Sequence, residues 1–558
     1  MKPHFFRSLL ALGICLVIST GCDQDEPGDT LNDAVGGAVG GAGGQSGGAY
    51  DPGGSSGGAG GGAGGGAGGA YGYEDEYGYG GQPSGAPVGG GGEYTPPVED
   101  APGSGEIVEN DFVDTAEDPL STFSIDVDTA SYTLARQRIT SGALPEAAQV
   151  RIEEFINFFR YNYPAPGPED EHPFAVHLDA APSPFGEGKH MLKIGLKGME
   201  IPAEARAPAN LVFLVDVSGS MSGPNKLGLV QHSLKLLTNS LQPTDTLSIV
   251  TYAGREATLL PPTPVFSRGV IFDAIDGLQS GGGTNGAGGL RRAYALAEQA
   301  FRPDGINRVV LCTDGDFNVG VTGQALIDEV ISWRDRGVYM TVLGYGYGLN
   351  DHFIETLTNE ADGNYAFVDS QNEALRVLGE RLVGTLQVIA KDVKIQVEFN
   401  PRRVERFRLV GYENRVLGHE DFEDDTVDAG EIGSGHFVTA LYELELAEVE
   451  GGEGGIARPL PEETLAEVRF RYKAPTGAPD RESVELSTAI AVGAVDGEPT
   501  ADFKLALAVA ELAEILRHSM HSEGARFDEV RALVDEATTD EPDRVELMSL
   551  IEAAAALY

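Results

Sequence analysis

The sequence predicts an α/β fold: a doubly wound, mainly parallel sheet with helices on both faces, flanked by antiparallel β structure and ending in helices. Three observations predict it. Residues 208–387 alternate short apolar runs with segments of helical periodicity, which is typical of a parallel sheet. The segments on either side alternate apolar and polar residues with a period of two, as half-exposed antiparallel strands do. Residues 501–558 return to a helical period.

The central segment, 208–387, is expected to be one Rossmann-like domain. Its first strand is the apolar run Leu211–Val215, and the first helix follows it with one apolar face. The later expected strands are Leu247–Tyr252, Arg308–Cys312, Val338–Gly344 and Tyr365–Val368. The later expected helices are Arg268–Leu278, Gly286–Phe301, Ala325–Arg336, His352–Glu360 and Asn372–Thr385.

The two flanks of this domain have the same β character. Residues 118–207 are expected to form helices, at Thr129–Ser141 and Gln149–Tyr161, and then strands. Residues 388–500 are expected to be rich in β structure, and the run Val393–Phe399 alternates apolar and polar side chains. We therefore expect one β-sandwich, built from both flanks, into which the α/β domain is inserted.

The amino terminus reads as a targeting segment, residues 1–22. Lys2 and Arg7 precede the apolar run Leu9–Ile18, and small residues precede Cys22. The apolar run is shorter than the roughly 20 residues that a membrane-spanning helix needs. The stretch resembles a bacterial lipoprotein signal with Cys22 as the lipidated residue, which implies a lipid-anchored protein of the bacterial envelope, on its periplasmic or cell-surface face. Plain secretion is the alternative.

Residues 23–117 are expected to be a disordered tether. Their composition is dominated by glycine with acidic residues, which cannot bury enough apolar surface to offset the entropy of the chain. The chain as a whole carries 39 Lys and Arg against 86 Asp and Glu, a net charge of -47. Such acidity excludes nucleic acid as the expected partner, because phosphates require a basic face. Of the three cysteines, Cys312 closes an apolar strand and is expected to be a small core residue.

Oxygen-bearing side chains gather where the predicted strands end. Asp216, Ser218 and Ser220 follow the first apolar strand of the central segment. Thr284 follows a run of glycines, and Asp314 follows a later apolar strand. Because the carboxyl ends of parallel strands share one sheet edge, these five groups are expected to meet there. Carboxylates and hydroxyls are ligands for hard cations, so the sequence predicts a divalent metal site.

This pattern resembles the metal-ion-dependent adhesion site of von Willebrand factor type A domains, with D-x-S-x-S, a glycine-flanked Thr, and T-D-G. The resemblance implies that Ser218, Ser220 and Thr284 contact Mg²⁺, while Asp216 and Asp314 act largely through water. Mn²⁺ and Ca²⁺ stay open as alternative ions. It also implies a protein partner whose acidic side chain completes the metal coordination. Singly, the serines would also fit helix N-caps and the aspartate a turn cap.

The flanks resemble those of one bacterial group of such proteins. The residues that carry this resemblance are FSIDVDTASYTLARQRITSGALP and EEFINFF before the domain, and FNP, FRLVGYENR, DFEDDTVDAGEIGSGH and TALYEL after it. It covers about 118–556 and implies a surface or periplasmic lipoprotein.

The expected function is metal-dependent protein binding at the bacterial envelope, without a small-molecule substrate. A structural envelope protein whose ion only stabilises loops, and an adaptor to an ATPase, are the alternatives. Catalysis is not expected, because no zinc-binding H-E-x-x-H helix occurs and Met221 stands where a G-x-S-x-G elbow would need serine. The acidic loop 420–431 is open between a second cation site and a solvated loop, and His436 is expected to be a hydrogen-bonded structural residue.

Overall fold

The computed structural model describes residues 107–558 except 285, 316–323, 347–350, 362, 382–383, 385, 448–459, 476–481, 523, 525 and 538–541, and only the backbone at 351–353 and 380. The expected signal peptide, the lipidated Cys22 and most of the expected tether lie outside the described residues. Within the described ranges, no helix combines the length and the hydropathy needed to cross a membrane.

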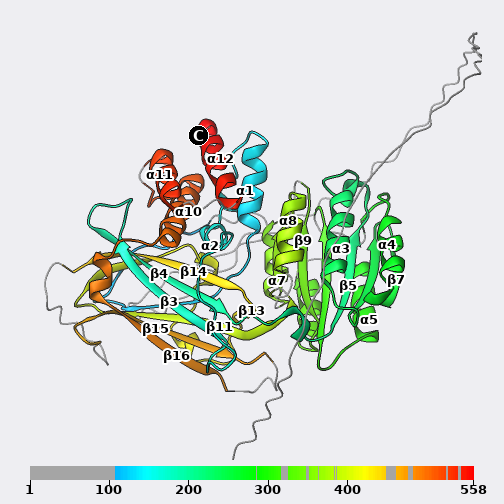
Figure 1. Ribbon diagram of the computed structural model, residues 1–558, viewed down its shortest axis with the longest axis horizontal. Helices are drawn as coiled ribbons and strands as arrows, with labels where there is room; N and C mark the ends of the chain where they lie inside the picture. Colours follow the sequence, from blue (N-terminus) through cyan, green and yellow to red (C-terminus); the bar gives the residue numbers. More distant parts are fainter. Residues whose placement is uncertain are drawn as a thin grey trace, which may run out of the picture. The chain divides into compact units, whose positions relative to one another are not determined.

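The central domain is built on one sheet with the strand order β10-β9-β8-β5-β6-β7 (Figure 1). Five strands run parallel, and β7 pairs with β6 in the antiparallel sense. Every residue of β5 and β8 is buried, and each strand carries a continuous apolar run, Leu211–Val215 in β5 and Val309–Cys312 in β8, instead of an alternating pattern. The strands are β5 Ala209–Asp216, β6 Thr246–Tyr252, β7 Glu256–Pro264, β8 Ile306–Thr313, β9 Tyr339–Gly344 and β10 Asn364–Phe367.

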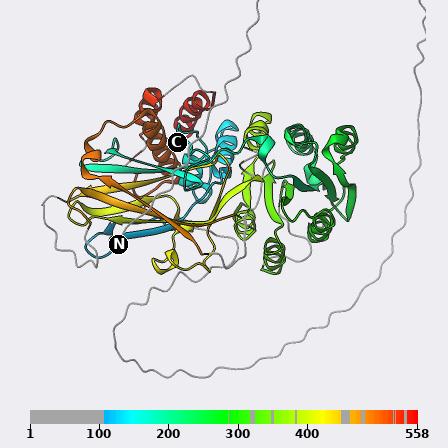
Figure 2. The ribbon, with the colours of Figure 1, turned by 60° about the horizontal axis from the view of Figure 1, so that its bottom comes forward.

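Helices cover both faces of this sheet (Figure 2), because successive side chains of a strand point to opposite sides. Leu211, Phe213 and Val215 of β5 share a core with α3, α4 and α8. Val212 and Leu214, between them, share a second core with α5, α6 and α7. The sheet is therefore doubly wound. The helices are α3 Leu227–Ser240, α4 Arg268–Asp276, α5 Gly286–Gln299, α6 Gln324–Arg334, α7 Asp351–Asn359 and α8 Gln371–Leu375.

Strand β7 has no counterpart among the strands expected from the sequence. It contains Pro261, Pro262 and Pro264, which lack the N–H that a central strand needs. β7 lies at the edge of the sheet, where one side of the strand has no neighbour to donate to. Prolines are tolerated in an edge strand, so the composition of β7 is compatible with its position.

Two expected helices are shorter in the structure. Instead of Gln149–Tyr161, only α2, Ile152–Ile156, is α-helical there. Asn157 ends it: its amide group donates to the hydroxyl of Tyr412 at 3.0 Å, and its Oδ1 accepts from the N–H of Thr439 at 2.8 Å. The expected helix over 372–385 is α8 followed by a π-helical turn, Arg376–Glu380. Contacts of Asn157 with distant residues therefore end α2 earlier than the helical pattern of the sequence predicts.

The flanking strands form two antiparallel sheets. One has the order β1-β12-β14-β4-β3, and the other has the order β13-β11-β15-β16, with β2 also paired to β11. The strands are β1 Val113–Asp114, β2 Leu120–Ser124, β3 Phe174–Pro182, β4 Lys189–Gly198, β11 Val388–Phe399, β12 Val404–Val410, β13 Gly430–Gly433, β14 Phe437–Leu446, β15 Thr464–Lys473 and β16 Val484–Ala491.

The two sheets pack against each other and draw on both flanks of the α/β domain. β4, which precedes that domain, pairs with β14, which follows it, with Ile194 opposite Ala440. Leu192 and Leu196 of β4 share one buried core with Val397 of β11 in the opposite sheet. The predicted insertion of the α/β domain into a β-sandwich is therefore confirmed.

Residues 113–115, at the end of the expected tether, take part in the fold. Val113 and Asp114 form β1, which pairs with β12, and the hydroxyl of Thr115 donates to the carbonyl of Val404 at 2.5 Å. The region 118–207 also opens with β2 before its first helix. The local composition of these residues predicts no secondary structure. They form a strand because they pair with residues about 290 positions away in the chain.

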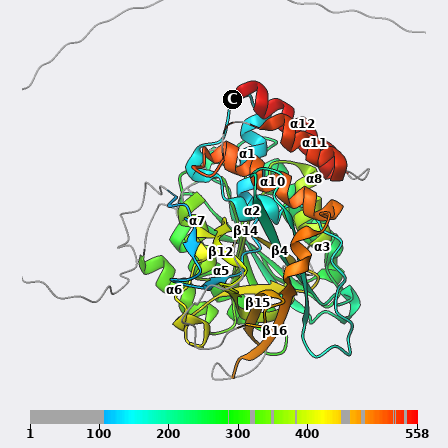
Figure 3. The ribbon, with the colours of Figure 1, turned by 90° about the vertical axis from the view of Figure 1, so that its left-hand side faces the viewer.

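Helices from both ends of the described chain share a further core. α1 Ala130–Thr140 and α2 pack with α10 Ala501–Arg517, α11 Phe527–Ala537 and α12 Pro542–Leu557. Figure 3 shows α1, α2 and α10 close to β14 and β4. Met191 of β4 and Leu441 of β14 contribute to the same core, so these helices cover one outer face of the sandwich.

Candidate metal centre

The five predicted metal ligands converge on the carboxyl edge of the parallel sheet. β5 ends at Asp216, and its neighbour β8 ends at Thr313, one residue before Asp314. The two strands pair in parallel with Val215 opposite Cys312, so both carboxylates emerge at the same edge. This is where open α/β sheets hold their ligands.

Four of the predicted residues form one hydrogen-bonded chain. The N–H of Ser218 donates to Oδ1 of Asp216 at 2.8 Å. The hydroxyls of Ser218 and Ser220 are 2.8 Å apart, and that of Ser220 donates to Oδ1 of Asp314 at 2.9 Å. A hydroxyl has only one hydrogen, so Ser218 is the donor between the serines. A fifth group, the hydroxyl of Thr313, donates to Oδ2 of Asp216 at 3.3 Å.

The serines do not act as simple helix caps. The turn that begins after Ser218 receives no hydrogen bond from that side chain, and α3 begins only after Lys226, with no side-chain cap. The alternative assignment of the two serines as N-caps of the next helix is therefore wrong. The carboxylate of Asp314 accepts a hydrogen bond from Ser220, and its alternative assignment as a turn cap depends on residues outside the described ranges.

Thr284 lies on a loop that is joined to the Asp216 loop through the backbone. The N–H of Gly281 donates to the carbonyl of Val217 at 2.7 Å, and the N–H of Gly219 donates to the carbonyl of Gly282 at 3.1 Å. Gly282 has a φ of +94°, which glycine adopts without strain. Thr284, two residues further on, is half-buried. The sheet edge thus carries all five predicted residues on three adjoining loops.

The carboxylates of the site are buried beneath an exposed hydroxyl. Asp216 is 3% exposed and Asp314 is 4% exposed, whereas Ser220 is exposed to solvent. Burial raises the pKa of Asp216, the hydrogen bond from the backbone N–H of Ser218 opposes the rise, and the charge of Asp314 adds to it. A cation between the two carboxylates would remove the cost of burying both negative charges.

Sequence analysis missed one residue of the site, Lys226. Its ammonium group donates to Oδ2 of Asp314 at 2.6 Å, on the oxygen that Ser220 leaves free. Gly346, with a φ of +80°, makes room for it, because a Cβ there would come within 2.5 Å of Cε of Lys226. Lys226 is the first basic residue after the D-x-S-x-S motif, which is the only local signal of its role.

The donor set fits a small divalent cation. Two buried carboxylates can balance its charge, and the hydroxyls of Ser218, Ser220 and Thr284 are hard oxygen ligands. Among the described residues, no group of three or more His, Cys, Asp and Glu gathers as a metal site. Lys226 supplies a positive charge to Asp314 in the structure, which means that an incoming ion competes with it.

The acidic loop 420–431 is held by the protein's own cations. Lys394 donates to the carbonyl of Asp421 at 2.9 Å. Asp425 pairs with Arg471 at 3.0 Å, and its carbonyl accepts from Lys473 at 2.6 Å. The segment is nevertheless a solvated loop for the most part, because Glu420, Glu423, Asp424 and Asp428 are exposed.

Cys312 is a core residue, as expected. It is fully buried, and burial raises the pKa of its thiol to about 12. A thiol that stays protonated is a poor nucleophile and metal ligand.

Comparison with known proteins defines the class of the chain. The family model described as "von Willebrand factor type A domain" matches residues 211–316, and one described as "von Willebrand factor" matches 104–193. Domains of this type are generally metal-dependent protein-interaction modules. An inter-alpha-trypsin inhibitor heavy chain H4 from Bos taurus is 29% identical over 165 residues, which are 28% of this chain and 18% of that protein.

The regions on either side of the α/β domain identify the family more closely. The model "Uncharacterized protein YfbK, C-terminal" matches residues 384–557. The Escherichia coli protein described as "Uncharacterized protein YfbK" is 36% identical over 466 residues, 80% of this chain and 80% of that protein. The chain therefore belongs to the YfbK family of von Willebrand factor type A domain proteins. Among solved structures, "von Willebrand factor type A from Catenulispora acidiphila" aligns with a TM-score of 0.40 at 17% identity, over 70% of this chain and 89% of that one.

Proposed function

We propose that this protein is a metal-ion-dependent protein-binding module of the bacterial envelope. The observation that supports it most directly is the hydrogen-bonded chain from Asp216 through Ser218 and Ser220 to Asp314. In the proposal, these residues and Thr284 hold Mg²⁺, with Mn²⁺ or Ca²⁺ as alternatives. The bound ion accepts an oxygen from an acidic side chain of the partner protein.

The chain's own residues prepare this binding. The exposed hydroxyl of Ser220 lies at the surface of the site, while Asp216 and Asp314 lie beneath it and balance the ion's charge. The backbone bonds between the Gly281–Gly283 loop and the Asp216 loop hold the ligands in place before an ion arrives. Preorganised ligands lower the entropic cost of binding.

The proposed location is the envelope membrane, through a lipid on Cys22. The support is the sequence of residues 1–22 and the composition of the segment that follows, which is suited to a flexible tether. Metabolic labelling with a palmitate analogue tests this part. The full chain should take up the label, and a Cys22→Ala variant should not; label on both proteins would contradict lipidation at Cys22.

The binding function is tested by affinity capture from an envelope extract with the full chain as bait. The arms are wild type with Mg²⁺, wild type with chelator, Ser218→Ala/Ser220→Ala with Mg²⁺, and Ser222→Ala with Mg²⁺. Ser222 is the matched control, since it is exposed and two residues beyond the ligands. The proposal expects one protein to be retained by wild type and by Ser222→Ala only when Mg²⁺ is present. Equal recovery in all four arms would contradict it.

A structural role for the ion is the second candidate, favoured by the contact between Lys226 and Asp314. That ion pair shows that a cation already stabilises the loops of this edge. If the ion only stabilises loops, the double serine variant will lower the melting temperature in Mg²⁺ without changing any captured protein.

A further inference from the structure

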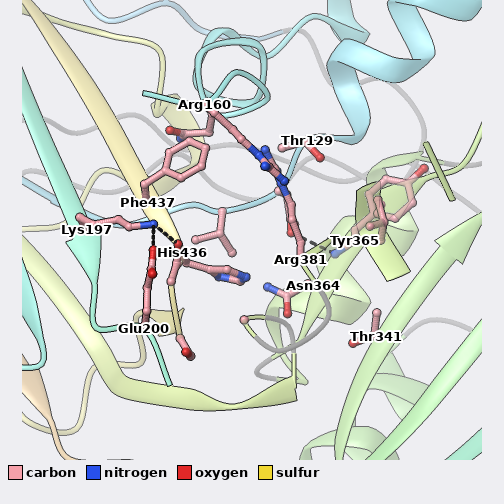
Figure 4. Close-up of a pocket in the computed structure, with 18 of the residues that line it drawn as sticks. Thr129, Arg160, Lys197, Glu200, Thr341, Asn364, Tyr365, Arg381, His436 and Phe437 are labelled. Carbon is pink, nitrogen blue, oxygen red and sulfur yellow. Dashed lines mark hydrogen bonds and ion pairs between the residues drawn. The ribbon is translucent and has the colours of Figure 1, made fainter. Parts of the chain in front are cut away.

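A cavity of 370 Å³ lies between the α/β domain and the β-sandwich, and its charged side chains are engaged with the protein itself. Figure 4 shows Lys197 and Glu200, whose charged groups are 3.1 Å apart. Arg381 donates to the carbonyl of Phe158 at 2.8 Å. Nδ1 of His436 is buried and has no hydrogen-bond partner among the described residues, so the expectation of a hydrogen-bonded structural histidine fails at that atom. A longer row of groups without partners lies at the surface, along one strand.

An edge strand presents a row of backbone N–H and C=O groups without partners, and most edges of this protein shorten or block that row. β7 carries three prolines, while β1 and β13 have only two and four residues. β10 also has four residues, and the N–H of its Tyr365 donates to the carboxylate of Asp128 at 2.9 Å. These strands leave little backbone for another chain to pair with.

The edges of β2 and β3 are covered by other parts of the chain. Phe123 of β2 bridges Val416, and the N–H of Leu417 donates to the carbonyl of Thr122 at 2.9 Å. The 3₁₀ turn Val492–Asp496 lies against β3, which ends in Pro182.

β16, Val484–Ala491, has none of these protections. It is eight residues long and contains neither proline nor lysine. β15 is its one neighbour in the sheet, and among the described residues its backbone makes no hydrogen bond to any other segment. Val484 is 41% exposed, and Ser487 and Ala489 are exposed as well. An unprotected edge of this length is a site for the addition of another strand.

The sequence of β16 is complementary to itself in the antiparallel sense. If Ser487 lies opposite Ser487 of a second copy, the residues that face each other across the pair are Val484 and Ile490, Glu485 and Ala489, and Leu486 and Thr488. Glu485 is the only charged residue of the strand, and in this register it does not meet its own copy. A parallel pair in register would place the two carboxylates side by side.

The same register extends the core of the sandwich. Leu486 and Ile490 belong to the face of β16 that packs in that core. Because directly opposite residues of two strands point to the same side, the apolar face of the second copy continues this face. The exposed Val484 at the edge then packs against Ile490 of the second copy.

We propose that two copies of this protein associate through β16, which pairs antiparallel with β16 of the second copy about a twofold axis at Ser487. The sheet β13-β11-β15-β16 then continues into the same sheet of the second copy. Association does not depend on a metal ion, because no residue of β16 belongs to the metal centre. The net charge of -47 on each copy opposes association, so salt strengthens it by screening that repulsion.

The test measures the mass of the full chain by sedimentation equilibrium with chelator, at low and at high NaCl and at concentrations up to about 100 µM. Every arm carries Cys22→Ala, so that a lipid cannot hold copies together. Ser487→Glu places two carboxylates at the twofold axis, and Arg469, opposite it on β15, stabilises the new charge within one copy. Ser332→Glu is the matched control, an exposed serine beside Arg336 on α6.

Wild type and Ser332→Glu are expected to form dimers whose dissociation constant falls as NaCl rises. Ser487→Glu should dimerise about tenfold more weakly or worse, because like charges directly opposite each other destabilise a strand pair. A wild type that has the mass of one copy at both salt concentrations would overturn the proposal. Equal association of wild type and Ser487→Glu would overturn it too.

Oxidative cross-linking gives a second readout that does not depend on the folding of Ser487→Glu. Ser487→Cys should form a disulfide-linked dimer on a non-reducing gel, since the two Cβ atoms at the axis are close enough for a disulfide. Ser332→Cys should not form one. Equal cross-linking of the two variants would count against pairing through β16.

Discussion

Replacement of Lys226 by methionine is expected to tighten metal binding at the sheet edge. The ammonium group of Lys226 is 2.6 Å from Oδ2 of Asp314, and the two side chains are 23% and 1% exposed. An ion that uses Asp314 must share its charge with this ammonium group or displace it. Methionine keeps the apolar stem that packs beside Gly346 and removes only the competing charge.

The size of the effect follows from the contact that is lost. A hydrogen bond between charged groups contributes about 1.5 to 3 kcal/mol. Since about 1.4 kcal/mol is a factor of ten, the dissociation constant for Mg²⁺ should fall by roughly 10- to 100-fold. Without metal, Lys226→Met should instead be less stable than wild type, because Asp314 keeps its buried charge without a partner.

Two measurements check this prediction. Calorimetric titration with Mg²⁺ gives the affinity, and thermal unfolding with chelator and with Mg²⁺ gives the stabilisation by the ion. The control is Lys235→Met, on α3, whose side chain is 36% exposed and pairs with Asp276 away from the site. An unchanged Mg²⁺ affinity in Lys226→Met, or an equal gain in Lys235→Met, would refute competition between Lys226 and the ion.

Two further predictions concern the scaffold. The pKa of Glu511 is raised to about 7 from 4.5, first by burial and then by the charge of Glu514. The folded protein therefore keeps a proton that the unfolded chain loses between these pH values, so stability falls as pH rises through this window. Glu511→Gln should remove this fall and gain up to ~3 kcal/mol over wild type at pH 8 but little at pH 4, by urea unfolding; equal gains at both would contradict it. Gly195→Ala should cost about 1 to 3 kcal/mol in the same assay, because its Cβ would lie 2.4 Å from the Tyr163 ring; unchanged stability would show that the ring moves freely.

The sequence allowed the α/β domain to be predicted because its signals are local. β5 is buried at every position, so its apolar residues are continuous in the chain and end directly at Asp216. The two serines of the motif lie two and four residues further on, within one loop. Asp314 could be added because β8 carries the same signal, an apolar strand that ends in a carboxylate.

Other features escaped sequence analysis because their partners are distant. Lys226 and Asp314 are 88 residues apart, so no local spacing indicates that they meet. β1 is two residues long and depends wholly on pairing with β12.

By itself, the sequence determined the order of the five parallel strands and the helices between them in the α/β domain, the insertion of that domain between β segments, and the five residues proposed to hold a metal ion. These features can be predicted because burial and periodicity are visible within a single strand or helix. The side chains of a strand alternate between its two faces independently of which strands lie beside it. Only the tertiary structure decided which cation lies on Asp314 and that β1 pairs with β12. These depend on distances between segments that are far apart in the chain, which folding alone sets.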